Sequence, residues 1–168
     1  MADAKVLVVM GSDSDFPVME GCFKMLNKFG VGFKATVASA HRTPDKAMSL
    51  ARNAEAEGFK VIIAAAGLAA HLGGVLAANT ALPVIGVPCK GGALAGVDAL
   101  YATVQMPTGI PVATVAIDGG SNAAILACQM LALSDAELMQ KIKDYKASLA
   151  SSVEERDARL QQKIAEMN

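Results

Sequence analysis

The sequence has few aromatic and few charged side chains. Of its 168 residues, 4% are aromatic, none is tryptophan, and 18% carry a formal charge. The net charge of −1 gives no basic surface of the kind that binds DNA or RNA. A ligand of nucleotide size remains compatible with this composition, because it needs only a few local contacts. The hydrophobic fraction of 53% excludes a disordered chain.

Long apolar runs and paired cysteines are also missing. The longest apolar run, residues 61–70, ends at His71 and is far shorter than the ~18 residues that a membrane-spanning helix needs. Residues 5–10 are too few for the core of a signal peptide. The three cysteines are widely spaced and form no CxxC pair. This pattern favours reduced thiols in a cytoplasmic protein and argues against disulfides and against a zinc site.

Small side chains supply most of the apolar fraction, with 15 glycines and even more alanines. Between Val61 and Ile117 only Lys90 and Asp98 carry a formal charge. A stretch so poor in charge belongs in a core or in a subunit interface, since water would solvate it badly. We therefore expect a homo-oligomer.

Apolar runs of strand length alternate with segments of helical periodicity. We expect strands over residues 5–10, 32–38, 61–66, 84–87 and 112–117. We expect helices over residues 16–29, 43–57, 96–104 and 121–133, a short helix from about His71, and a last helix opened by a capping box at 134–137. The alternation predicts an α/β fold, a three-layer sandwich with a central parallel sheet, flavodoxin-like or Rossmann-like.

The chain reads as one domain, residues 1–168, without repeats or an interdomain linker. Residues 134–168 form a C-terminal helical extension, which we expect to project. Its apolar stripe, which includes Leu138 and Ile142, needs a surface to cover. That surface belongs either to the same domain or to a neighbouring subunit, and the sequence leaves both open.

Polar residues directly follow the first three predicted strands. Ligands of parallel α/β sheets bind outside the carboxyl ends of the strands, so these loops are the candidate site. The first loop is GSDSD at 11–15, the second SAHRTP at 39–44, and the third GLAAHLGG at 67–74. Both histidines of the chain, His41 and His71, fall at this one edge.

The first loop enters a helix, where free backbone N–H groups and the helix dipole favour an anion. Ser12 and Ser14 add hydroxyl donors, and the Asp15 carboxylate suits the two hydroxyls of a ribose. The alternative is that Ser14 and Asp15 only cap the helix. Neither GxGxxG nor GxxxxGK[ST] is present, which disfavours a dinucleotide or Walker-type site.

The second and third loops carry the remaining candidates. Arg42 can hold a phosphate through two hydrogen bonds and Ser39 can add a donor, while an imidazole such as His41 can take and return a proton. The alternative is a turn capped by Thr43, with His41 incidental and Arg42 solvated. His71 fits a direct catalytic role and packing beneath a helix equally well. Later in the chain, we expect Lys90 to be a solvated loop residue.

Taken together, these loops resemble the 5-(carboxyamino)imidazole ribonucleotide mutases of de novo purine synthesis, in their bacterial class. The matching runs are MGSDSD at 10–15, SAHRTP at 39–44, AAHL at 69–72, PVIGVP at 83–88, and VQMP at 104–107 with GIPV at 109–112. Arg42 fits the mutases, because the related class that uses free CO2 tends to carry Lys there. The chain departs from the family at four positions: the family usually has Gly at 65 and 68, Pro at 73 and Trp at 16.

The resemblance implies a cofactor-free isomerisation that moves a carboxylate from the exocyclic amine of a mononucleotide to ring carbon 4. The route would be decarboxylation, retention of CO2 and recarboxylation, with His41 as proton shuttle and His71 near the ring. The family's substrate-binding residues correspond to Ser12, Ser14, Ser39 and Arg42 at the phosphate, Asp15 at the ribose, and also Ala40, Gly67, Ala70 and Leu72. The family's octamer, with sites at subunit contacts, would account for the uncharged middle of the chain.

Two alternatives stay open. One is an aminoimidazole ribonucleotide carboxylase that uses free CO2 directly. The other is a non-enzymatic flavodoxin-like module that binds a nucleotide or acts as a receiver domain. A receiver needs a lysine after its last strand, and Asp118, Gly119 and Gly120 follow Ile117 instead.

Overall fold

The computed structural model describes residues 3–167, so residues 1–2 and 168 of the expected domain lie outside it. Five strands form one parallel sheet in the order β2-β1-β3-β4-β5. The strands are β1 (Ala4–Met10), β2 (Gly32–Val37), β3 (Val61–Gly67), β4 (Val84–Cys89) and β5 (Ala113–Thr114). The helices are the single-turn η1 (Asp13–Asp15), α1 (Phe16–Phe29), α2 (Pro44–Ala54), α3 (Leu72–Ala77), α4 (Val97–Val104), α5 (Gly120–Ala132) and α6 (Ala136–Ala165).

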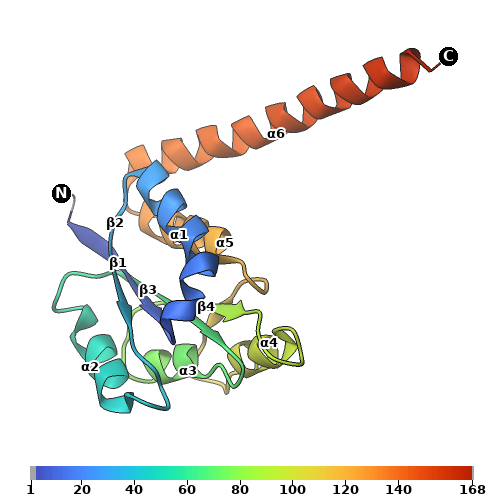
Figure 1. Ribbon diagram of the computed structural model, residues 1–168. Coiled ribbons are helices and arrows are strands. Elements are labelled where there is room, and N and C mark those ends of the chain that lie inside the picture. Colours follow the sequence, from blue (N-terminus) through green and yellow to red (C-terminus); the bar gives the residue numbers. More distant parts are fainter. Residues whose placement is uncertain (1–2, 168) are drawn as a thin grey trace.

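Helices cover both faces of the sheet, as the alternation of elements predicts (Figure 1). Successive side chains of a strand point to opposite faces. Val6 and Val8 therefore pack in one core with α1, α5 and the start of α6, whereas Leu7 and Val9 pack in a second core with α2 and α3. Both faces of β1 are buried, so its run of apolar residues is continuous. The predicted three-layer α/β sandwich is confirmed.

Small residues bring α1 and α5 close together over the first core. Ala123, Ala124 and Ala127 on α5 are fully buried. At the start of α5, a Cβ on Gly120 would lie 2.6 Å from the carbonyl oxygen of Val18 on α1. Glycine is the one residue that fits this contact without a shift of either helix. The alanine-rich composition thus has a direct role in helix packing.

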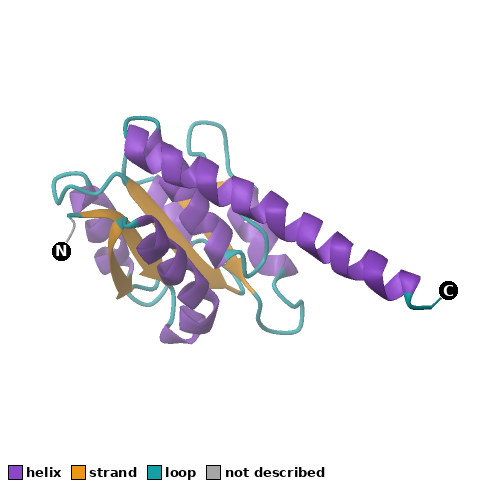
Figure 2. Cartoon of the chain, turned by 90° about the horizontal axis from the view of Figure 1, so that it is seen from above, coloured by secondary structure: helices purple, strands orange, loops and turns teal. Residues whose placement is uncertain are grey.

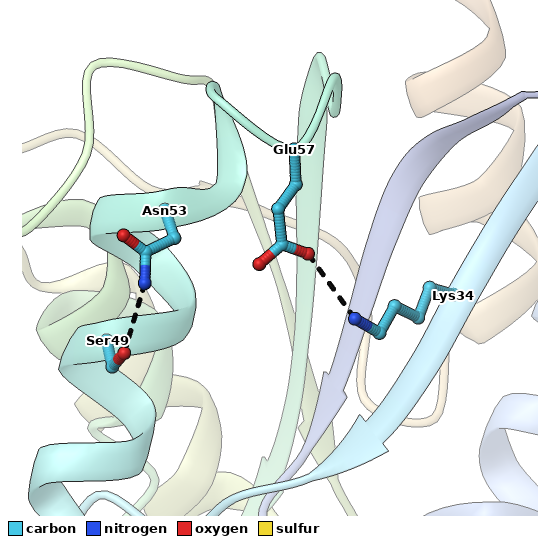
Figure 3. A network of polar contacts seen from close by, with 4 residues as sticks. All are labelled: Lys34, Ser49, Asn53 and Glu57. Carbon is cyan, nitrogen blue, oxygen red and sulfur yellow. Dashed lines mark hydrogen bonds and ion pairs between the residues drawn. The ribbon is translucent and has the colours of Figure 1, made fainter.

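Strand β2 forms one edge of the sheet, and its outer side carries charge. Lys34 of β2 lies 3.3 Å from Glu57, in the turn after α2 (Figure 3). Asn53 donates a hydrogen bond of 3.2 Å to Ser49 within α2 in the same view. A charged side chain on an edge strand discourages pairing with the edge of another sheet.

Several element boundaries differ from the expectations. The strand expected over 112–117 is reduced to Ala113–Thr114. Pro88 of β4 has no N–H to extend this ladder, and its carbonyl instead accepts a bond of 2.9 Å from Asp118 N–H. The second helix ends at Ala54 rather than 57, because a turn closes there with Gly58 at φ +91°.

The last helix also begins differently. The N-cap is Asp135, whose carboxylate accepts a bond of 2.9 Å from the N–H of Leu138, so the expected capping box at Ser134–Glu137 is wrong. Leu138 and Ile142 are buried against the first core, and beyond them α6 runs away from the sandwich (Figure 2). Along this part Leu149, Val153 and Leu160 are about half exposed. No helix in residues 3–167 is both long enough and apolar enough to cross a membrane.

The α1–α5 contact makes a prediction about stability. Gly120→Ala places a methyl group against the Val18 carbonyl, and overpacking of this kind costs about 1–3 kcal/mol. We expect urea denaturation to show a loss of unfolding free energy in that range. Gly91→Ala is the matched control, because nothing lies within 4 Å of a Cβ there. Equal stabilities of the two variants would contradict the proposed contact.

Candidate functional site

A cavity of about 520 Å³ opens at the carboxyl ends of the strands. The loops after β1, β2, β3 and β4 line it, so segments far apart in the sequence meet there. Every site residue expected from the sequence lies on its wall: Ser12, Ser14, Asp15, Ser39, Ala40, His41, Arg42, Gly67, Ala70, His71 and Leu72. A second hollow of about 440 Å³ adjoins it and shares Ser12, Ser39 and Arg42.

The loop after β1 is held by hydrogen bonds among its own residues. Ser12 N–H donates to the Asp15 carboxylate at 3.0 Å, and Ser14 N–H donates to the Ser12 hydroxyl at 3.3 Å. Two of the N–H groups expected to be free here are therefore already engaged. The Ser14 hydroxyl donates to the Ser12 hydroxyl at 2.9 Å, and the Ser12 hydroxyl donates to the Asp13 carboxylate at 3.1 Å. Both hydroxyls line the cavity, and each would turn away from its partner within the loop to donate to a bound anion. An anion bound at this loop would meet both the serine hydroxyls and the N-terminus of α1, which no side chain caps.

Asp15 occupies the N-cap position of α1 but does not cap it, because its carboxylate turns back to Ser12. The side chain is only 8% exposed. Burial raises the pKa of Asp15, and the hydrogen bond from Ser12 N–H offsets part of that effect. A carboxylate deprived of water in this way has unused acceptor capacity. It is well suited to accept hydrogen bonds from the hydroxyls of a sugar.

The loop after β2 is fixed by Ser39 and Thr43. Thr43 accepts a bond of 2.9 Å from Ser39 N–H and donates one of 3.1 Å to the Ser39 carbonyl, rather than capping α2. The Ser39 hydroxyl accepts a bond of 3.1 Å from Arg42 N–H. This turn leaves the side chains of His41 and Arg42 exposed at the cavity. A rigid turn with a free imidazole and a free guanidinium can bind an anion and move a proton next to it.

The loop after β3 places His71 at the N-cap position of α3. Its Nδ1 lies 3.4 Å from the Ala102 carbonyl, and its ring lies over Gly74, where a Cβ would be 2.5 Å from Cε1. The buried Thr103 hydroxyl donates to the carbonyl of the preceding residue, Ala70, at 3.3 Å. His71 thus packs on its helix, as one of the two expectations has it, and also lines the cavity. Its direct catalytic role stays a prediction.

Leu68 sits in the same loop with strained backbone. Its φ is +57°, a left-handed conformation that costs a residue with a side chain about 1 kcal/mol. The side chain is 56% exposed and lies over Gly92, whose Cβ position is 2.7 Å from Cδ2 of Leu68. The family that this chain resembles usually has glycine at 68, which would adopt this φ freely.

Part of the wall was not anticipated from the sequence. The end of β4 contributes Cys89, and the loop after it contributes Lys90, Gly91 and Gly92. Lys90 is exposed, as expected of a loop residue, but it also faces the site. Its position directly after a strand was the available signal. Ala66 is a further lining residue outside the expected loops, whereas Gly11, Leu68 and Ala69 belong to them.

Cys89 lies beside Asp15 at the base of the cavity. Burial, together with the Asp15 and Asp118 carboxylates, raises the pKa of the Cys89 thiol to about 12. The thiol therefore stays protonated at neutral pH and serves as a donor rather than a nucleophile. Cys22 and Cys128 are buried and unpaired as well. In residues 3–167 no three His, Cys, Asp or Glu side chains are grouped so as to hold a metal ion.

Fold and cavity together define a parallel α/β protein with a small-molecule site at the strand ends, lined by hydroxyls, two imidazoles, a guanidinium and a buried carboxylate. Residues 5–152 match the family model described as AIR carboxylase. The chain belongs to this family.

Curated relatives and solved structures agree with that assignment. The chain is 51% identical to an N5-carboxyaminoimidazole ribonucleotide mutase of Pyrococcus horikoshii, over 92% of this chain and 88% of the relative. It is 50% identical to the Escherichia coli K12 protein of the same name, over 89% and 90%. The crystal structure of Treponema denticola PurE superposes with a TM-score of 0.84 at 32% identity, covering 92% of this chain and 97% of that one.

The strained loop can be tested with two variants of one residue. Leu68→Gly and Leu68→Ala remove the same exposed side chain, but only glycine relieves the left-handed backbone. We expect the glycine variant to unfold at higher urea, with an unfolding free energy about 1 kcal/mol above that of the alanine variant. An alanine variant as stable as the glycine variant would show that the backbone at 68 is not strained.

Proposed function

We propose that the chain isomerises N5-carboxyaminoimidazole ribonucleotide to 4-carboxy-5-aminoimidazole ribonucleotide in de novo purine biosynthesis. The cavity carries this proposal, because it gathers the serines, histidines and arginine of three separate loops. Relatives at about half identity along most of their length bear the mutase name. The chain is accordingly an enzyme, an isomerase.

In this proposal the loops after β1 and β2 bind the phosphate and the sugar. The hydroxyls of Ser12, Ser14 and Ser39 donate to phosphate oxygens, and the Arg42 guanidinium neutralises their charge. Asp15 accepts hydrogen bonds from the ribose hydroxyls. The hydrogen bonds within both loops support these roles, because they fix the side chains before the nucleotide arrives.

The chemistry then takes place at the imidazole end. The bond between the exocyclic nitrogen and its carboxyl group breaks, CO2 leaves, and the nitrogen receives a proton from His41. Ring carbon 4 attacks the retained CO2, and its proton passes to His41, which restores the starting state. The electron-rich aminoimidazole is itself the nucleophile, so the scheme needs no metal or cofactor.

The loop after β3 is suited to retaining CO2. Gly67, Ala70 and Leu72 line the cavity with small or apolar groups, and Ala40 does so from the loop after β2. An apolar wall keeps water from the CO2 and from the ring carbon, which limits escape and side reactions. His71 stands in this wall, near the ring in the proposed pose.

We further propose a cytoplasmic homo-oligomer, an octamer by resemblance to the family. Exposed apolar side chains support an assembly, since isolated chains rarely leave so many in water. They lie before and along α4 and on the projecting part of α6, at Leu94, Val97, Tyr101, Val104, Leu149, Val153 and Leu160.

A carboxylase that takes free CO2 is the second candidate. The chain is 51% identical to a phosphoribosylaminoimidazole carboxylase of Saccharomyces cerevisiae, but it covers only 25% of that protein. Arg42 favours the mutase, because the class that uses free CO2 tends to carry Lys at that position.

A direct assay separates the two reactions. We expect purified protein to convert the carboxyamino nucleotide in buffer containing a metal chelator, and to be much slower with aminoimidazole ribonucleotide plus bicarbonate. Product formation followed by ultraviolet absorbance measures both rates. Faster turnover with bicarbonate would identify a carboxylase, and no turnover with either would refute the proposal.

The role of His41 has its own test. Removal of a proton-transferring group typically costs about 10²–10⁴-fold in rate, so His41→Asn should lose at least about 100-fold in kcat while still binding nucleotide. Arg42→Ala is the matched control from the same turn, with a raised KM as its main effect. Near-normal turnover of His41→Asn would exclude His41 as the shuttle.

A further inference from the structure

The loop after β4 brings a second basic side chain to the cavity. Strand order places β2 and β4 three positions apart, with β1 and β3 between them. Arg42 follows β2 and Lys90 directly follows β4, and both line the same cavity. With about 4.8 Å between neighbouring strands, the two loops start roughly 14 Å apart. The cavity thus has a positive group at each end.

The proposed substrate has a matching distribution of charge. Its phosphate lies at one end, on the sugar, and its carboxylate lies at the other, on the imidazole. If Arg42 and the serines of the first two loops take the phosphate, the imidazole extends across β3 toward β4. A lysine on a long, flexible stem is suited to meet a carboxylate there.

The backbone of Lys90 is held in place although its side chain is exposed. Its N–H donates a hydrogen bond of 2.7 Å to the Asp118 carboxylate. Asp118 in turn has φ +58° and donates its own N–H to the Pro88 carbonyl at 2.9 Å. On the other side Gly96 packs so closely that a Cβ there would lie 3.0 Å from the Lys90 Cα. The backbone from which the Lys90 side chain extends is therefore fixed at the cavity wall.

We propose that Lys90 binds the carboxylate at the base end of the nucleotide, and so distinguishes carboxylated nucleotides from the uncarboxylated one. The inference rests on the proposed function, and it adds a residue to that site. Lys90 neither takes nor gives a proton in this role. It pairs with the carboxylate both on nitrogen in the substrate and on carbon 4 in the product.

The test compares three nucleotides that share the phosphate and ribose. Two carry the carboxylate, the proposed substrate and product, and aminoimidazole ribonucleotide lacks it. We expect Lys90→Met to raise KM for the substrate and Kd for the product about tenfold or more, the usual loss when a charged hydrogen-bond partner is removed. Binding of the uncarboxylated nucleotide should change less than twofold, and Lys90→Arg should restore part of the loss.

Two controls make the outcome specific. Lys60→Met makes the same change just before β3, at the amino ends of the strands and so on the opposite side of the sheet from the cavity, and should not alter binding of any of the three nucleotides. Arg42→Ala should weaken the binding of all three nucleotides, because each carries the phosphate. If Lys90→Met weakened the binding of all three nucleotides equally, or of none, the role assigned to Lys90 would be overturned. If the wild-type chain bound none of the three nucleotides, the proposed function itself would be refuted. If the wild-type chain bound and converted the substrate and Lys90→Met changed neither, only the role of Lys90 would be refuted.

Discussion

The parallel register of the sheet is the constraint on which the site depends. Parallel strands end on one side, so the loops that follow them share an edge whatever their distance along the chain. Met10 pairs with Val37 on one side and with Ala65 on the other, and Gly67 pairs with Cys89. A cavity with hydroxyls at one end and a lysine at the other follows from this register. A slip of one strand by a residue would turn its side chains to the wrong face and separate the loops.

Hydrogen bonding within the loops then decides which groups face a ligand. In the first loop the N–H groups of Ser12 and Ser14 and both serine hydroxyls donate to partners within the loop, which sets the side chains along the cavity wall. The second loop ties its backbone to Ser39 and Thr43. Groups that are already oriented lose little entropy on binding. Asp15 differs from these groups, because burial raises the pKa of its carboxylate and the carboxylate keeps acceptor capacity for the hydroxyls of a ligand. The site is therefore suited to a ligand with hydroxyl groups.

Much of this arrangement could be predicted from the sequence, for identifiable reasons. Apolar runs bounded by glycine and proline located four strands and helix α1. The position of a polar loop after each strand placed His41, His71 and Arg42 at the carboxyl ends of the strands. What failed depended on local hydrogen-bond choices. Asp15 bonds to Ser12 rather than capping α1, and Asp135 replaces the expected cap of the last helix. The missed Lys90 has no local motif, since its place in the wall depends on β4 lying beside β3.

Backbone strain falls on one side of the site. In the part of the chain that the structure describes, the non-glycine residues with positive φ are Leu68, Ala95 and Asp118. Leu68 lies over Gly92, Ala95 follows in the same segment, and Asp118 holds the N–H of Lys90. All three bear on the loops after β3 and β4, whereas the loops after β1 and β2 have none. Strained conformations persist only where their surroundings enforce them. The backbone strain is therefore confined to the end of the cavity where, in the proposed reaction, the carboxylate moves from nitrogen to carbon. The loops proposed to bind the phosphate have unstrained turns.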